Sequence, residues 1–360
     1  MVVLSVFQPL GVILTSFIAW LLIPSHSCPD SLPSCLAVDS DLVKCCSREI
    51  NQGWRWTAIV LGCIGLMCFF FRVVVFTFVE SPRFLISIGR DREAVKVIDH
   101  ISRFNDQEPV LDNESFIAID EDPTLEHDDD DDDGRDSVLQ QKEENKKGLL
   151  GKAMSFIDFS RLAPLFSTRK RARLAILIWL IYCFDFFAFT IAGSFLPKIL
   201  HDKGAARAVS IDRTYANYIL IAACGIPGVL LGAAVSQSPR IGRRKAMVAT
   251  SLLMAGSLVA YVKIDSEEAN VAFNALEFFS QSSFNSILYA YAPLAFPTAV
   301  RGTAVGIAST VGRLTSILSP LAGAQLYATR GPDAVLYLAG ATTLVATIGC
   351  ALLPSAEGIE

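Results

Sequence analysis

Long apolar runs constrain the fold of this 360-residue chain more than any other feature. They lie near residues 2–23, 57–79, 173–197, 215–237, 246–263, 270–292, 301–327 and 333–353. A helix needs about 20 apolar residues to cross the hydrocarbon core of a bilayer. Each run is close to that length. The runs therefore predict an all-α fold, a multi-pass transmembrane helix bundle with about eight spans.

The composition agrees with a chain that lies largely in lipid. Hydrophobic residues make up 52% of the chain, and the mean hydropathy is +0.44 although an acidic stretch near residues 104–147 lowers it. The net charge of −5 comes largely from that stretch, so it does not indicate a nucleic-acid partner. The first run could be a cleaved signal peptide, but it has no basic start and is long for one. We expect it to be a span, with the lipid bilayer as the surroundings.

Basic residues are enriched in alternate loops, as the positive-inside rule requires. The enriched positions are Arg83, Arg90, Arg92, Lys96, Arg169, Lys170, Arg171, Arg173, Arg240, Arg243, Arg244, Lys245 and Arg301. The intervening loops carry fewer lysines and arginines. This pattern predicts that both termini are cytoplasmic, in the plasma membrane or in a vacuolar or vesicular membrane.

The apolar runs divide the chain into three expected regions. Residues 1–79 hold two spans and a cysteine-rich outer loop, residues 80–172 form a cytoplasmic linker, and residues 173–360 form a six-helix bundle. The linker contains the acidic run 128–133. A block of like charge repels itself, which favours a solvated, disordered linker over a cation or partner site.

Four cysteines crowd into the first loop, which the charge pattern places outside. They are Cys28, Cys35, Cys45 and Cys46. An oxidising compartment would let them form two disulfides, although their connectivity does not follow from the sequence. The alternative is unpaired thiols.

Three ionisable side chains, those of Asp185, Glu277 and Arg313, fall inside apolar runs. At 1.5 Å per helical residue, each lies roughly 16 to 18 Å from the inner surface, close to the bilayer midplane. A lone charge there costs roughly 2.5 to 3.5 kcal/mol, so such residues usually pair or line a solute pathway. Their positions favour transport.

Glu277 begins a polar row on one helical face, because Gln281 and Asn285 follow at four-residue spacing. Facing a water-filled cavity, this row could bind a polar solute. The alternative is an interhelical hydrogen-bond seam. Asp185 and Arg313 could form a buried ion pair between two helices or act as a proton or substrate switch. Asp185 and Glu277 are the candidate proton carriers.

The fourth run is interrupted by the segment Gly225-Ile226-Pro227-Gly228. Proline removes a backbone hydrogen bond and glycine permits a bend. We therefore expect an interruption of this span.

Motifs of enzyme sites are missing from the sequence. No nucleotide-binding loop, zinc-ligand spacing or nucleophile elbow occurs. The sequence predicts no enzyme, no cofactor and no metal site.

Three motifs stand at the ends of apolar runs. They are Glu80-Ser81-Pro82-Arg83-Phe84-Leu85, then Arg240-Ile241-Gly242-Arg243-Arg244, and finally Tyr289-Ala290-Tyr291-Ala292-Pro293 with Arg301-Gly302-Thr303. They resemble signatures of the major facilitator superfamily, in its sugar-porter-like members and its synaptic-vesicle-glycoprotein-like and fungal organic-solute branch. The resemblance covers nearly the whole chain.

The resemblance implies alternating access, with the solute held between two six-helix halves. Asp185, the row from Glu277, and Arg313 would lie on three of the four cavity helices that the last half supplies. The implied cytoplasmic gating residues are Glu80, Arg83, Arg240, Gly242, Arg243, Arg244 and Arg301. Aligned on the motifs, the chain begins at helix five, so we expect a fragment of a longer transporter or a short form.

The chain departs from the family pattern at three places. Pro239 stands where the cytoplasmic loop motif usually has aspartate. Leu294 stands where glutamate commonly follows the proline, and Val79 stands where the sugar-porter signature begins with proline. These departures weaken the cytoplasmic charge network that the family uses to hold one conformational state. The gating of this chain is therefore expected to differ from that of the family.

The function expected from the sequence is secondary active or facilitative transport of a small polar organic solute by alternating access, with protons as a possible coupling ion. The alternative is a truncated, non-transporting membrane protein that binds a partner as a regulatory scaffold. A channel is not expected, because no repeated pore ring is visible.

Overall fold

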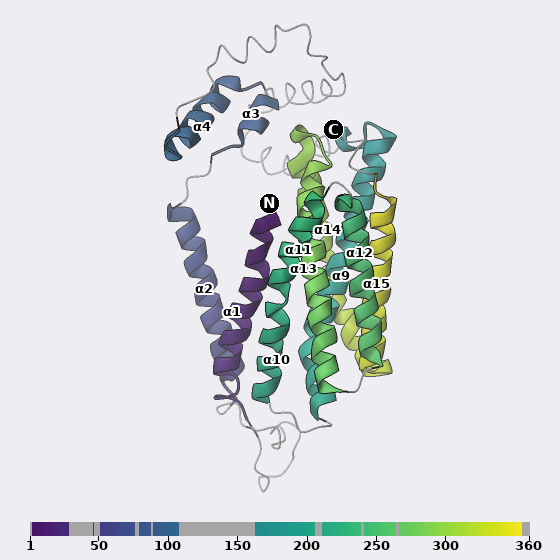
Figure 1. Cartoon of the computed structure of the whole chain (residues 1–360). Helices are drawn as coiled ribbons and strands as arrows, with labels where there is room; N and C mark the ends of the chain where they lie inside the picture. Colours follow the sequence, from purple (N-terminus) through teal and green to yellow (C-terminus); the bar gives the residue numbers. More distant parts are fainter. Residues whose placement is uncertain are drawn as a thin grey trace, which may run out of the picture. The chain divides into compact units, whose positions relative to one another are not determined.

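The regular structure is helical throughout the part of the chain that is described (Figure 1). The computed structural model describes residues 2–28, 46, 51–75, 79–87, 89–107, 163–205, 211–238, 241–263 and 266–354. The acidic run 128–133, Arg240, Cys35 and Cys45 lie outside these ranges. The all-α prediction is confirmed for the described residues.

The long helices follow the apolar runs, with boundaries shifted by a few residues. They are η1 (Val2–Val6), α1 (Phe7–Leu22), α2 (Gly53–Val75), α3 (Pro82–Ser87), α4 (Asp91–Phe104), α8 (Ala163–Phe166), α9 (Arg169–Ala205), α10 (Ile211–Ala223), α11 (Gly225–Gln237), α12 (Gly242–Val262), α13 (Glu267–Leu294), α14 (Thr298–Arg330) and α15 (Pro332–Leu352). The short helices α3, α4 and α8 lie between these runs. The expected interruption of the fourth span is confirmed, because the helix is interrupted at Cys224, between α10 and α11.

Seven helical stretches in the described part are long and apolar enough to cross a membrane. They are Leu4–Leu22, Gly53–Val74, Arg169–Phe195, Asp212–Gln237, Gly242–Val262, Val300–Arg330 and Pro332–Leu352. The remaining predicted span, 270–292, lies in α13. Its 28 residues would extend roughly 42 Å. Its length is sufficient, but its polar side chains make it less apolar than the seven stretches above.

Two compact units are present. The larger contains Met1–Val75, Leu177–Tyr291 and Thr310–Glu360, and the smaller contains Phe76–Ile176 and Ala292–Ser309. These units do not follow chain order, because residues distant in sequence pack together. The division into 1–79, 80–172 and 173–360 stays a prediction about family organisation.

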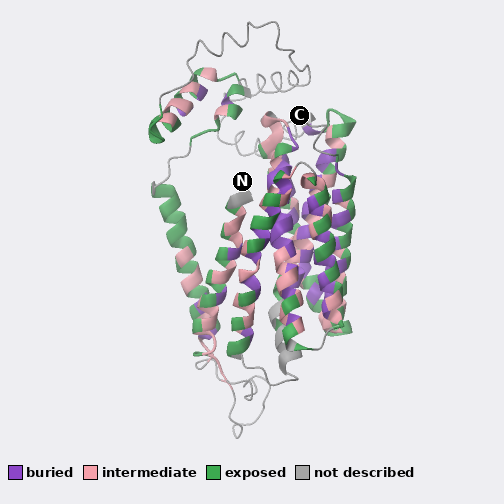
Figure 2. Ribbon diagram, in the orientation of Figure 1, coloured by how far each residue is buried: buried purple, intermediate pink, exposed green. Residues whose placement is uncertain are grey.

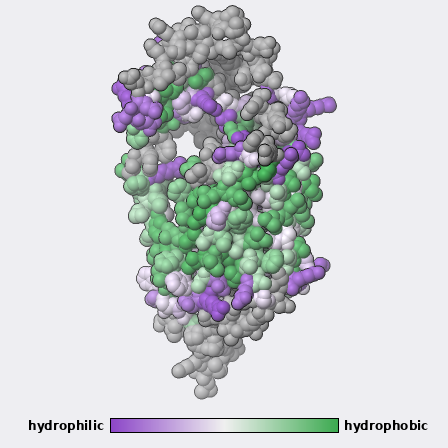
Figure 3. Space-filling view, in the orientation of Figure 1, coloured by the Kyte–Doolittle hydropathy of each residue, from purple (hydrophilic) through white to green (hydrophobic). Residues whose placement is uncertain are grey.

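In the larger unit, the first helices pack on the later ones. Helix α1 contacts α2 and α10, η1 contacts α11, and α12 packs along α15. The indole Nε1 of Trp20 donates a 2.7 Å hydrogen bond to Asp212 Oδ1, which joins the end of α1 to the first turn of α10. Hydrophobic side chains lie along the visible sides of the spanning helices (Figure 3), as lipid-facing surfaces require.

Helix α13 is the most enclosed element of this unit. Residues 280–288 are all buried, whereas most residues of α2 are exposed (Figure 2). Helix α11 approaches α13 through Gly225, Gly228 and Gly232. A Cβ at Gly228 would overlap the backbone of Phe279, and the Ser283 hydroxyl donates to the Gly228 carbonyl. Small residues thus permit close helix contact and an interhelical hydrogen bond.

Hydroxyl side chains join α14 to α9. The Ser319 hydroxyl donates to the Phe187 carbonyl at 2.8 Å, and Thr190 donates to Ser316 at 3.0 Å. Gly312 lies against the Phe186 ring. Because these contacts fix the rotation of both helices, they also fix the direction in which Asp185 and Arg313 point.

The smaller unit contains the short helices α3 and α4, which pack on each other. Leu85, Ala94 and Val97 form their shared apolar core. Arg90 pairs with Glu93 and Arg103 with Asp99 on the outside of α4. These pairs are exposed and contribute little to stability.

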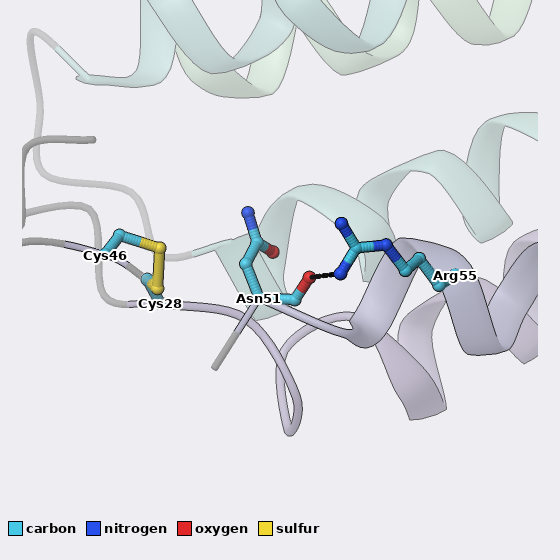
Figure 4. The surroundings of a disulfide bond; sticks show 4 residues. All are labelled: Cys28, Cys46, Asn51 and Arg55. Carbon is cyan, nitrogen blue, oxygen red and sulfur yellow. Dashed lines mark hydrogen bonds between the residues drawn. A yellow bond between two sulfur atoms is a disulfide. The ribbon is translucent and has the colours of Figure 1, made fainter. Parts of the chain in front are cut away.

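One disulfide joins Cys28 to Cys46, with 5.9 Å between their Cα atoms (Figure 4). It closes the loop between α1 and α2 near the hydrogen bond that Arg55 donates to the Asn51 carbonyl. Cys28 and Cys46 are two of the four cysteines among which the sequence predicted disulfides. Cys35 and Cys45 are not among the described residues.

Candidate functional site

Asp185 is buried in the middle of α9 and is bonded across to α13. Its side chain is 1% exposed, and the amide Nε2 of Gln281 donates a 3.3 Å hydrogen bond to its Oδ1. The other carboxyl oxygen, Oδ2, has no hydrogen-bond partner among the described residues. A buried acceptor without a partner is costly, so its presence needs an explanation.

The polar row on α13 is also buried. Glu277 is 7% exposed, and Gln281 and Asn285 are 1% and 2% exposed. Neither Gln281 Oε1 nor Asn285 Oδ1 has a partner in the described part of the chain. The bond from Gln281 to Asp185 is the kind expected of an interhelical seam. The oxygens Gln281 Oε1 and Asn285 Oδ1 take no part in such a seam. They are available to accept a hydrogen bond from a protonated group, a water molecule or a solute.

The two carboxyl groups lie close enough to affect each other. Asp185 and Glu277 lie within electrostatic range of each other and would repel when both are ionised. Asp185 lies on α9 and Glu277 on α13, and their common depth in a membrane stays a prediction. What the two groups do there stays a prediction.

The position of Arg313 differs from the one expected for a buried ion pair with Asp185. Its side chain on α14 is exposed, and no ion pair joins it to Asp185 among the described residues. The reason is helix rotation, because Gly312, Thr315 and Ser316 take the face that packs on α9. Arg313 lies within electrostatic range of Tyr289 on α13.

Aromatic residues around Asp185 were missed by the sequence reasoning. Tyr182 is 2% exposed, stacks on Phe186 at 5.9 Å between ring centroids, and lies 6.0 Å from the ring of Tyr289. A signal for both tyrosines was available. Tyr182 precedes Asp185 by about one turn, and Tyr289 extends the row of Gln281 and Asn285 by another four residues.

The implied gating residues divide between the two units. In the smaller unit Glu80 and Arg83 are exposed, whereas Arg301 is partly buried and donates to the Phe296 carbonyl at 3.5 Å. In the larger unit Gly242 has φ +68°, which favours glycine. The Arg244 guanidinium donates to the Ala351 carbonyl at the end of α15, and Arg243 is partly buried beside it in sequence. Their role in gating stays a prediction.

Two features of the geometry are now established: a bundle of helices long and apolar enough to span a membrane, and a buried set of carboxyl and amide groups inside it. The family model described as the Major Facilitator Superfamily matches residues 178–358. The chain belongs to the major facilitator superfamily. The resemblance found in the sequence is therefore confirmed, and the family is one of transporters.

Curated relatives of this facilitator chain are similar over nearly its whole length. An uncharacterized MFS-type transporter of Schizosaccharomyces pombe is 30% identical over 353 residues, which cover 98% of this chain and 61% of that protein. The MFS siderochrome iron transporter 1 of Ceriporiopsis subvermispora is also 30% identical, covering 98% and 63%. Organic cation/carnitine transporter 7 of Arabidopsis thaliana is 25% identical, covering 91% and 60%.

A solved structure confirms the fold of this facilitator chain. The MFS proton:xylose symporter XylE matches with a TM-score of 0.60 and 15% identity, covering 98% of this chain and 64% of that one. At this identity the likeness shows the fold alone. The chain spans about three fifths of the length of the curated relatives it matches.

Proposed function

We propose that this facilitator chain takes part in secondary transport of a small polar organic solute by alternating access, coupled to protons through Asp185 or Glu277. The observation that supports it best is the buried group of Asp185, Glu277 and Gln281 on facing helices, with acceptors left unpartnered. Ionisable residues inside a membrane are retained because they carry protons or bind solutes.

The solute class is inferred from the chemistry of this group and from the names of relatives. Carboxyl, amide and tyrosine side chains offer hydrogen bonds to a polar solute, and the rings of Tyr182 and Tyr289 offer apolar contact. The relatives and the structural neighbour are named for siderochrome iron, organic cations or carnitine, and xylose. All of these are compatible with a site of mixed polar and aromatic character.

The remaining expectations extend this proposal. Both termini are proposed to be cytoplasmic, and the basic turn with Gly242, Arg243 and Arg244 is proposed to hold one conformational state on that side. The Arg244 bond to the Ala351 carbonyl supports this role, because it ties the start of α12 to the end of α15. Glu80, Arg83, Arg240 and Arg301 are proposed as further gating residues on the basis of the sequence resemblance alone.

Uptake into proteoliposomes that contain the 360-residue chain tests the proposal. The probes are carnitine, tetraethylammonium, a ferric siderochrome and xylose, each with and without a proton gradient that drives protons inward. A gradient of one pH unit supplies about 1.4 kcal/mol per proton, so one coupled proton supports roughly tenfold accumulation.

We expect one probe to accumulate with the gradient and to equilibrate without it. Protein-free liposomes and liposomes with heat-unfolded protein are the controls. If no probe enters faster than in the controls, the result contradicts transport by this chain and favours the partner-binding scaffold.

A further inference from the structure

Two unpartnered acceptors flank the single hydrogen bond between α9 and α13. Gln281 Nε2 donates to Asp185 Oδ1, whereas Asp185 Oδ2 and Gln281 Oε1 have no partner in the described structure. The two orphan oxygens belong to the same two planar groups that the hydrogen bond already joins. Two acceptors cannot bond each other without a proton between them.

One proton placed between these two oxygens would satisfy both of them at once. A carboxylic acid and a primary amide each carry a carbonyl acceptor and a donor on neighbouring atoms, so they can form two parallel hydrogen bonds. With a proton on Oδ2, the Asp185 hydroxyl donates to Gln281 Oε1 while Nε2 keeps its bond to Oδ1. The ionised carboxylate leaves Oε1 unpartnered, because both of its oxygens are acceptors.

We propose that Gln281 is a positioning residue that recognises the protonated form of Asp185 and joins α9 to α13 by a two-bond ring only in that form. This rests on the proposed proton-coupled transport and adds its conformational consequence. A proton taken from the aqueous phase adds to Oδ2 and neutralises the carboxylate. Its release to the aqueous phase restores the carboxylate and reduces the ring to one bond.

Several ionisable groups surround this pair, and the test keeps all of them. Tyr182 lies on α9 itself, and Glu277 and Tyr289 come from α13. Arg313 on α14 acts on Tyr289, and Cys350 on α15 is within the electrostatic influence of Asp185. No variant in the experiment alters these residues.

Infrared difference spectroscopy on the full chain in lipid nanodiscs, recorded while the pH is lowered, tests the proposal. An acid carbonyl band is expected to appear in the parent and to be missing in Asp185→Asn. Gln281→Leu is expected to shift this band to higher wavenumber, because the acid carbonyl loses its donor. Asn274→Leu is the matched control, since Asn274 is a buried amide of the same helix that donates to the Asn270 carbonyl.

The control is expected to leave the Asp185 band in place, and an unshifted band in Gln281→Leu would overturn the proposal. A second measurement needs no change at Gln281. With ¹³C-labelled glutamine, acidification is expected to lower the side-chain amide carbonyl frequency in the parent and not in Asp185→Asn. No change in the parent would also overturn the proposal.

The spectra require no solute, so the two proposals fail separately. Band changes as expected without uptake of any probe would contradict the transport proposal and leave the Asp185–Gln281 pair intact. Proton-driven uptake together with an unshifted Asp185 band in Gln281→Leu would support the transport proposal and contradict the Asp185–Gln281 pair.

Discussion

Asp185→Asn is expected to abolish accumulation of the transported probe under an inward proton gradient, while slow equilibration of the probe remains. The change keeps the size of the side chain and its acceptor oxygen but removes the group that gains and loses a proton. Without a coupled proton, the gradient does no work on the solute. Accumulation should fall from roughly tenfold at a gradient of one pH unit to about equal concentrations inside and outside.

Glu277→Gln distinguishes which carboxyl carries the proton. Both residues are buried on facing helices, so either could carry it. Loss of accumulation in only one variant assigns the carrier. Equal accumulation and an unchanged pH profile in both variants would contradict proton coupling through this group. Glu268→Gln, at an exposed position of α13, is the matched control.

Gly228→Ala is expected to destabilise the bundle more than any other exchange of glycine for alanine in α11 or α12. The added Cβ would overlap the Phe279 backbone, which cannot move aside as a side chain can. Separating α11 from α13 would also break the bond from Ser283 to the Gly228 carbonyl. Overpacking of this kind costs up to about 3 kcal/mol, which corresponds to a drop in Tm of roughly 5 °C or more.

The control for this prediction is Gly256→Ala in α12. A Cβ at Gly256 meets no described atom within 4 Å, so the exchange tests helix propensity without a clash. The Tm of each variant is measured on the purified chain in detergent. Size-exclusion chromatography after heating gives the fraction that remains folded at each temperature. Equal Tm values for the two would show that α11 and α13 do not pack as closely as described.

Much of the fold could be predicted from the sequence, because lipid imposes strong constraints on a spanning segment. The apolar runs located seven spanning stretches, and the glycines and proline near residue 226 located the break between α10 and α11. Helix α13 was predicted by its length and its apolar positions. Its polar row set it apart, and the structure shows that this helix is the enclosed one.

The candidate site was only partly predictable. Depth along a helix follows from counting residues, so Asp185 and Glu277 could be placed near the same level. Rotation about the helix axis depends on packing, and Gly312 turned Arg313 away from the expected partner. The bond between Gln281 and Asp185 joins residues far apart in sequence, and no local pattern marks it.

Solute-driven proton movement is the most direct test of the central claim, that this chain couples a solute to protons through buried carboxyl groups. Proteoliposomes contain a pH-sensitive dye, no gradient is imposed, and the transported probe is added outside. We predict that the lumen acidifies as the probe enters, and that Asp185→Asn or Glu277→Gln prevents this acidification. Entry of the probe at the normal rate with no change in luminal pH would contradict the account.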